Sequence, residues 1–237
     1  MKLLNFLRRN KIKNWRVSQD YELRATLEFM DSDFFRARAQ EIHSGQRNAS
    51  VGFFDDILLK EFFDGKETYF KEFIAHITNR ACLDIGPCVA TPLKSWDVTN
   101  EKFVIEPLFD TINNWQIENY GFSLYEGIKC YPIPAENRIE ELVGKIDGVI
   151  YCRNCIDHTP HWPFILSNIS HYAKSGCKLM LWNDLFHGEG VDDGHYNITE
   201  APENFSQLIE ALGFHVVREF RDFNRLSVNW GCFAEKK

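Results

Sequence analysis

The chain has 237 residues, of which 44% are hydrophobic and 26% are charged, and its formal net charge is −7. These values are typical of a soluble chain with one substantial core. The acidic balance disfavours nucleic-acid binding, because phosphate binding needs a net basic face. A small-molecule or glycan substrate is therefore favoured over RNA or DNA.

The seven cysteines are an odd number and lie mostly in predicted strands, where cysteine behaves as a small buried hydrophobe. We therefore expect a reducing, cytoplasmic compartment. No run approaches the ~18 apolar residues needed to span a bilayer. The apolar start of the chain is interrupted by Arg8 and Arg9 before a signal-peptide core can form.

Residues 1–70 are helical in pattern and begin with a basic amphipathic stretch. A second helical stretch, residues 21–39, precedes a turn-rich segment at residues 44–50. We expect a helical N-terminal extension that forms a lid on the remaining residues, 71–237. Contact of the basic helix with a membrane is the less favoured alternative. The sequence does not predict an oligomeric state.

Residues 71–237 alternate short apolar strands with helical stretches. This alternation implies right-handed crossovers and a parallel sheet. After a polar, glycine-rich loop at residues 186–195, one helix and two closing strands complete the predicted pattern. The predicted strands are 81–85, 102–106, 128–131, 148–153, 178–183, 215–220 and 231–235, and the closing helix is 199–212.

The most informative motif is a buried strand that ends in a tight turn at Gly86 and is followed by a second strand that ends at Glu106. Glu106 lies 22 residues after Asp84. A turn of this kind brings backbone close to a ligand, and an acidic residue ~20 positions later can accept hydrogen bonds from two ribose hydroxyls. The motif therefore predicts a nucleoside-cofactor site.

The turn itself indicates which cofactor. A dinucleotide site uses G-x-G-x-x-G, whereas this turn reads Gly86-Pro-Cys-Val-Ala-Thr91, and Pro87 removes an amide donor. A cofactor without phosphate suits it better. Here the chain resembles the class I S-adenosylmethionine-dependent methyltransferases, whose first motif is Asp-x-Gly-x-Gly-x-Gly. Asp84 and Gly86 match it, while Cys88 and Ala90 replace its second and third glycines.

The resemblance extends over residues 75 to 237, through a third-strand loop at 134–136, a fourth motif at 146–158 and a helix-end turn at 174–181. It implies a Rossmann-like α/β fold: a seven-stranded, mostly parallel sheet with helices on both faces and one antiparallel strand near the C-terminus. It also implies S-adenosylmethionine as cofactor. The implied cofactor-binding residues are Asp84, Gly86, Pro87, Cys88, Glu106, Pro107, Ala135, Glu136 and Asn154.

His158 is the preferred general base for methyl transfer to a hydroxyl. It follows the fourth strand, at the sheet edge where ligands of open α/β folds bind, and histidine titrates near neutral pH. Asp157 could orient it. The alternative is that His158 caps the helix that begins near Thr159 and Pro160.

Two further patterns have weak support. Cys152 and Cys155 have the Cys-x-x-Cys spacing of redox and zinc motifs, but no second pair of ligands stands at similar spacing. The histidines 158, 161, 187 and 195 also lack a metal-binding spacing, so we expect no metal.

Two classes of function therefore stay open. The first is transfer of a methyl group to a hydroxyl or amine of a small molecule or sugar. The second is a non-catalytic binding module that keeps the methyltransferase fold and docks to a membrane or protein partner. The replaced glycines, Cys88 and Ala90, are the feature that keeps the second class open.

Overall fold

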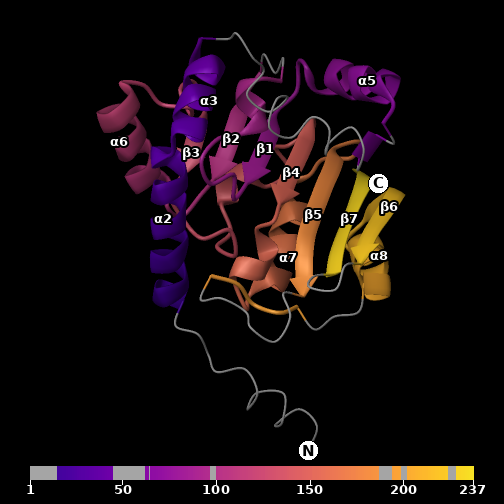
Figure 1. Ribbon diagram of the computed structural model, residues 1–237. Helices are drawn as coiled ribbons and strands as arrows, with labels where there is room; N and C mark the ends of the chain where they lie inside the picture. The colour runs from indigo at the N-terminus through magenta and orange to yellow at the C-terminus, as the bar shows by residue number, and fades with distance from the viewer. Residues whose placement is uncertain are drawn as a thin grey trace, which may run out of the picture.

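The computed structural model describes residues 15–44, 62–63, 65–96, 100–186, 194–198, 202–223 and 228–237. Seven strands form one sheet in the order β3-β2-β1-β4-β5-β7-β6 (Figure 1). The strands are β1 (Cys82–Ile85), β2 (Lys102–Ile105), β3 (Lys129–Tyr131), β4 (Val149–Arg153), β5 (Lys178–Phe186), β6 (Phe214–Phe223) and β7 (Val228–Lys236).

The sheet is mostly parallel, as the sequence predicts. Neighbouring strands from β3 to β5 pair in parallel, and β7 pairs antiparallel with both β5 and β6. The strand order reverses at β1, because β2 and β3 lie on one side of it and β4 and β5 on the other. Ligands of open α/β sheets bind outside the carboxyl ends of the strands at such a reversal.

Alternating strand residues supply the two faces of the sheet. In β4, Ile150 and Cys152 belong to the core beneath α7 (Trp162–Tyr172) and α8 (Pro202–Ala211). Val149 and Tyr151 belong to the opposite core, beneath α5 (Glu67–Ile77). Helices therefore cover both faces, and this part of the prediction is confirmed.

Three more helices pack beside β2 and β3: α2 (Trp15–Asp31), α3 (Asp33–His43) and α6 (Phe109–Tyr120). In α2, Met30 is fully buried in the same core as Phe35 of α3 and Ile112 of α6. The single helical stretch predicted at residues 21–39 is in fact two helices. They divide at Ser32, whose hydroxyl accepts a hydrogen bond from the Phe35 amide and so caps α3.

Short 3₁₀ turns complete the described chain: η1 (Pro92–Lys94), η2 (Glu140–Leu142) and η3 (Ile156–His158). Three predicted features lie wholly or mostly outside the described residues: the basic stretch before residue 15, residues 45–50 of the turn-rich segment, and residues 187–193 of the polar loop. Among the helices described, none combines the length and the apolar character that a bilayer crossing needs.

Candidate functional site

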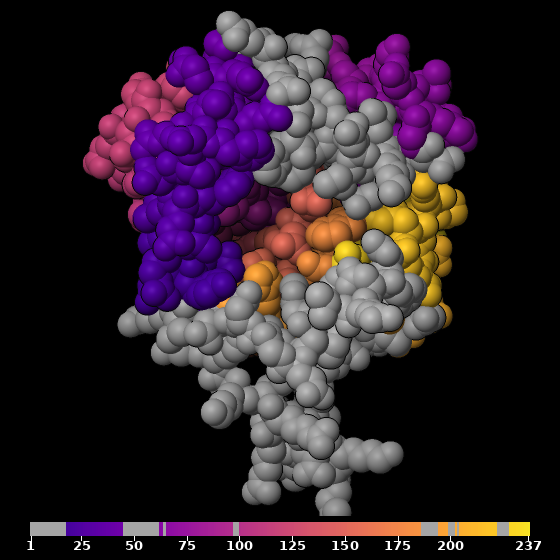
Figure 2. Space-filling view, viewed as in Figure 1, coloured from indigo at the N-terminus to yellow at the C-terminus, as the bar shows by residue number. Residues whose placement is uncertain are grey.

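A cavity of about 380 Å³ lies at the carboxyl ends of β1, β2 and β4. In Figure 2 the molecule is hollowed beside α2, and the floor of the hollow has the colours of β4 and β5. One wall is α2, which contributes five residues: Gln19, Glu22, Ala25, Thr26 and Phe29. The cavity thus lies where the reversal of strand order predicts a ligand.

The turn after β1 holds the backbone close to this cavity. Gly86 has φ +70°, which side chains disfavour, and a Cβ there would lie 2.5 Å from Sγ of Cys155. The Gly86 amide donates to the Ile105 carbonyl at 2.9 Å, which fixes the turn to β2. Glycine is therefore required at position 86 both by the backbone conformation and by the packing against Cys155.

Cys88 has the backbone conformation of the glycine that it replaces, with φ +59°. Its Sγ lies 3.0 Å from the hydroxyl of Thr26 in α2, and its carbonyl accepts a hydrogen bond from the Tyr125 hydroxyl. Burial raises the pKa of the Cys88 thiol to about 12, so the thiol stays protonated at neutral pH. A protonated thiol is a poor nucleophile and a poor metal ligand.

Glu106 lines the cavity from the end of β2 and is 5% exposed. Its Oε2 accepts a hydrogen bond from the Cys88 amide at 3.0 Å, and its Oε1 accepts one from the Leu108 amide at 2.9 Å. Burial raises the pKa of Glu106, while the two amides oppose that rise. Each oxygen keeps a further acceptor position, so the carboxylate is oriented by the turn without being saturated.

Asp84 lies beside Glu106 and is 1% exposed. Within the part of the chain that the structure describes, neither carboxyl oxygen of Asp84 makes a hydrogen bond of good geometry, although the Thr91 hydroxyl and the Ile85 amide are near enough to stabilise its charge. Burial raises the pKa of Asp84 to about 8 against the effect of Thr91, and the neighbouring Glu106 adds to the rise. A buried carboxyl group with such weak partners is costly, so this residue is suited to a ligand that brings a donor or a positive charge.

The remaining predicted cofactor residues also lie here. Pro87, Pro107 and Asn154 line the main cavity, and Asn154 has a strained φ of +50°. Ala135 and Glu136 line a smaller cavity of about 50 Å³. The two cavities adjoin, because five residues line both of them: Gln19, Gly86, Pro107, Cys155 and His158.

Of the predicted catalytic pair, His158 lines both cavities, whereas Asp157 is fully buried and lines neither. Nδ1 of His158 is 3.3 Å from Oε1 of Glu22 and 3.1 Å from the Gly194 carbonyl oxygen. Its Nε2 is 3.8 Å from Oδ1 of the fully buried Asp157, beyond hydrogen-bond distance. Burial alone lowers the pKa of His158, but Glu22, Asp157 and the Gly194 carbonyl raise it to about 9. The imidazole is therefore protonated at neutral pH in the free protein.

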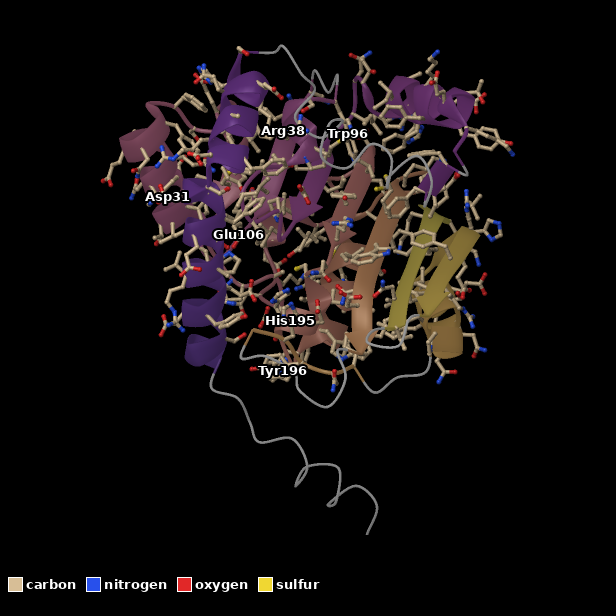
Figure 3. The ribbon with its side chains drawn as sticks, viewed as in Figure 1. Asp31, Arg38, Trp96, Glu106, His195 and Tyr196 are labelled. Atoms are coloured by element: carbon tan, nitrogen blue, oxygen red, sulfur yellow. The ribbon has the colours of Figure 1, made fainter. Side chains whose placement is uncertain are left out.

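The ring of His195 packs against that of His158 in a tilted arrangement, with ring centroids 4.4 Å apart and an interplanar angle of 49°. Figure 3 shows His195 below Glu106, toward the lower ends of the strands. The other two histidines considered from the sequence do not join this pair in the described structure: His161 is exposed at the start of α7, and His187 lies outside the described residues.

The sequence predicts an N-terminal helical lid but does not identify which residues of α2 line the cavity. Gln19, Glu22 and Thr26 follow the i, i+3, i+7 spacing of one helix face, and all three line the cavity. Thr26 is 5% exposed. A polar stripe on the helix predicted to cover a ligand site was the available signal, although an exposed helix face gives the same pattern.

No protein-family model and no curated sequence matches the chain. Solved structures do match it. A protein from Listeria monocytogenes described as an S-adenosylmethionine-dependent methyltransferase aligns with TM-score 0.52 and 11% identity, over 73% of this chain and 97% of that one. A [4+2]-cyclase, SpnF, aligns with TM-score 0.51 and 11% identity, over 71% of this chain and 80% of that one.

A third match is a phosphoethanolamine N-methyltransferase 2 from Haemonchus contortus, solved with phosphomonomethylethanolamine and S-adenosylhomocysteine. It aligns with TM-score 0.52 and 12% identity, over 73% of this chain and 52% of that one. The chain therefore has the fold of the class I S-adenosylmethionine-dependent methyltransferases, as the motifs predict. Because a cyclase shares this fold, the fold does not identify a reaction.

Proposed function

We propose that this protein transfers a methyl group from S-adenosylmethionine to a hydroxyl or amine of a small molecule or sugar. The observation that carries the proposal is the pair of buried carboxyl groups, Asp84 and Glu106, on one cavity at the reversal of strand order. Fold neighbours described as S-adenosylmethionine-dependent methyltransferases support the choice of chemistry.

The cofactor half of the cavity fits a nucleoside joined to an amino acid. Glu106 keeps acceptor positions for ribose hydroxyls, and Asp84 is a buried carboxyl group whose pKa stays raised despite the nearby Thr91 hydroxyl, so it is suited to an ammonium group. A volume of about 380 Å³ lies within the usual range for ligand sites. Ala135 and Glu136 in the adjoining cavity would border the adenine.

The bound cofactor supplies an electrophilic methyl group on a positively charged sulfur. The protein contributes alignment of the acceptor and exclusion of water. For a hydroxyl acceptor, His158 would act as general base in its neutral form, and Asp157 and Glu22 would stabilise the imidazolium that results. Because the pKa of His158 is raised to about 9, the rate of this step should increase as the pH rises toward about 9. An amine that enters uncharged needs no base.

The N-terminal residues 1–70 complete the site as a lid on the domain formed by residues 71–237. Five cavity-lining residues of α2 support this division, and so does the contact of Thr26 with Cys88 in the glycine turn. Closure by α2 would exclude water from the reacting groups.

The test is binding of S-adenosylhomocysteine to the full chain, measured by calorimetry. We expect saturable binding at one site, and Glu106→Ala should weaken it at least about tenfold, because a hydrogen bond to a charged group contributes ~1.5–3 kcal/mol. Glu118→Ala is the matched control, since Glu118 is exposed on α6. Absence of binding by the wild-type chain, or equal affinity in Glu106→Ala, would contradict the proposal.

A further inference from the structure

Three side chains that line the cavity form a cluster apart from the predicted cofactor-binding residues. The potential ligand atoms of Glu22, His158 and His195 all lie within 4.8 Å of one another. They come from α2, from η3 and from the segment 194–198. Each side chain is about one fifth exposed, at 21%, 19% and 18%, so an ion from solvent could reach them.

A buried carboxylate lies on the far side of the two imidazoles. Asp157, which is fully buried, lies 3.8 Å from Nε2 of His158 through one oxygen and 3.9 Å from Nε2 of His195 through the other. Both distances exceed hydrogen-bond length, so a small shift would be needed before Asp157 supports the two rings as carboxylates support metal-bound histidines. The other nitrogen of His158, Nδ1, faces Glu22.

One pair of these ligand atoms already has the spacing of a metal site. Oε1 of Glu22 and Nδ1 of His158 are 3.3 Å apart, close to the separation of about 3.4 Å between two ligands in a tetrahedral site with bonds near 2.1 Å. The Gly194 carbonyl oxygen, 3.1 Å from the same Nδ1, is also an acceptor of Ser18. For Nδ1 of His158 to bind a metal, this contact with the Gly194 carbonyl must break, and that carbonyl then keeps its bond from Ser18.

We propose that Glu22, His158 and His195 form a binding site for a divalent transition-metal ion. Two imidazoles and one carboxylate are the ligands of zinc and non-haem iron sites, whereas Mg²⁺ and Ca²⁺ take oxygen ligands. Three protein ligands leave an open position for an exogenous oxygen.

The open position also indicates the acceptor. A metal ion at this place would bind an acceptor through a hydroxyl oxygen and lower the pKa of that hydroxyl. In that case His158 acts as a ligand, and the metal replaces it as the group that activates the acceptor. This consequence rests on the proposed methyl transfer, whereas the metal site does not.

The experiment is a Co²⁺ titration of the full chain, stripped of metal with a chelator and followed by visible absorption. Co²⁺ stands in for zinc and reports the donor atoms through its ligand-field bands. We expect saturation at one equivalent, with competition by Zn²⁺ and little competition by Mg²⁺. Glu22→Gln and His195→Ala should each weaken Co²⁺ binding at least about tenfold.

Matched controls change the same residue types outside the cluster. Glu28→Gln alters an exposed glutamate of α2, and His161→Ala alters an exposed histidine beside α7, and both should bind Co²⁺ as the wild type does. Circular dichroism shows whether each variant is folded. Because the two test residues lie on separate segments, failure of one variant to fold still leaves the other informative.

Three results would overturn the proposal: no ligand-field band at one equivalent, affinity unchanged in both test variants, or thiolate-to-cobalt bands alone, which would place the ion on cysteines. Calorimetry with S-adenosylhomocysteine is performed on the same preparations without metal. Metal binding without cofactor binding would refute the proposed function but support the metal site. Cofactor binding without metal binding would support the proposed function but refute the metal site.

Discussion

The two ends of the cavity are built in different ways. At the cofactor end, Asp84, Gly86 and Glu106 lie within one strand–turn–strand unit, and backbone hydrogen bonds set their positions. At the acceptor end, the contacts join segments far apart in the chain: the Ser18 hydroxyl donates to the carbonyl of Gly194, 176 residues later. The first end is local in sequence, and the second exists only when α2 is packed on the sheet.

This difference has a functional consequence. A turn held by backbone bonds tolerates side-chain changes, so Cys88 and Ala90 can replace glycines without removing the cavity. An end built from side chains on three segments is sensitive to each of them, which makes it the place where substrate preference can change while the fold does not. Substitutions at the two ends should therefore alter different quantities.

The largest expected effect is at the acceptor end. His158→Ala should lower the turnover number by ~10²–10⁴ for a hydroxyl acceptor, the range for loss of general acid–base catalysis, while the dissociation constant of S-adenosylhomocysteine stays nearly unchanged. The rate would be measured with an acceptor found by screening hydroxyl and amine compounds. A small change in turnover would indicate an amine acceptor or a structural histidine. A large loss of cofactor affinity would contradict the division between the two ends.

The fold could be predicted from the sequence because short apolar runs separated by helices leave few topologies. The predicted limits of β5 were less accurate. The predicted strand ends at residue 183, but the observed strand continues to Phe186 through two polar residues, Asn183 and Asp184, that interrupt the apolar pattern. One of them, Asn183, is fully buried and accepts hydrogen bonds from the amides of Cys155 and Ile156. Its role depends on tertiary contacts that local pattern does not contain.

Only the cofactor end of the site could be predicted in full from the sequence. Asp84, Gly86 and Glu106 carry recognisable spacing, and the structure places all of them on the cavity. No sequence spacing identifies Glu22, because its partner His158 belongs to a distant segment that follows β4. The sequence also does not show which face of α2 is turned toward the sheet. Contacts between side chains far apart in the sequence depend on how the helices pack. Hydrophobic periodicity shows which face of a helix is buried, but not which residues that face will contact.

A smaller effect should appear in the pH dependence of cofactor binding. In the free protein the pKa of Asp84 is raised to about 8, so the free energy of unfolding falls as pH rises from the ordinary carboxyl pKa of 3.8 toward about 8 and levels off above it. An ammonium group bound beside Asp84 lowers that pKa, so binding releases a proton below about pH 8. Affinity for S-adenosylhomocysteine should then rise with pH, by at most about tenfold per unit, and level off above about 8.

Calorimetry at about pH 6, 7 and 8.5 in buffers of different ionisation enthalpy measures both the affinity and the proton release. Asp84→Asn should flatten the profile, because the amide cannot titrate. Glu106, whose pKa is also raised, is unchanged in that variant, so any pH dependence of affinity that remains measures the contribution of Glu106. A profile as steep in Asp84→Asn as in the wild type would remove Asp84 from the cofactor site.

The smallest effect concerns the glycine turn. Cys88 has φ +59°, a conformation that costs a residue with a side chain about 1–2 kcal/mol, so Cys88→Gly should relieve strain while it loses the contact with Thr26. Stability should change by less than about 1 kcal/mol, since glycine also increases the freedom of the unfolded chain. Binding of S-adenosylhomocysteine should be equal or tighter in Cys88→Gly and weaker in Cys88→Leu, whose larger side chain extends into the cavity. Equal affinity in both variants would mean that the turn lies away from the ligand, and the cofactor end would have to be placed elsewhere.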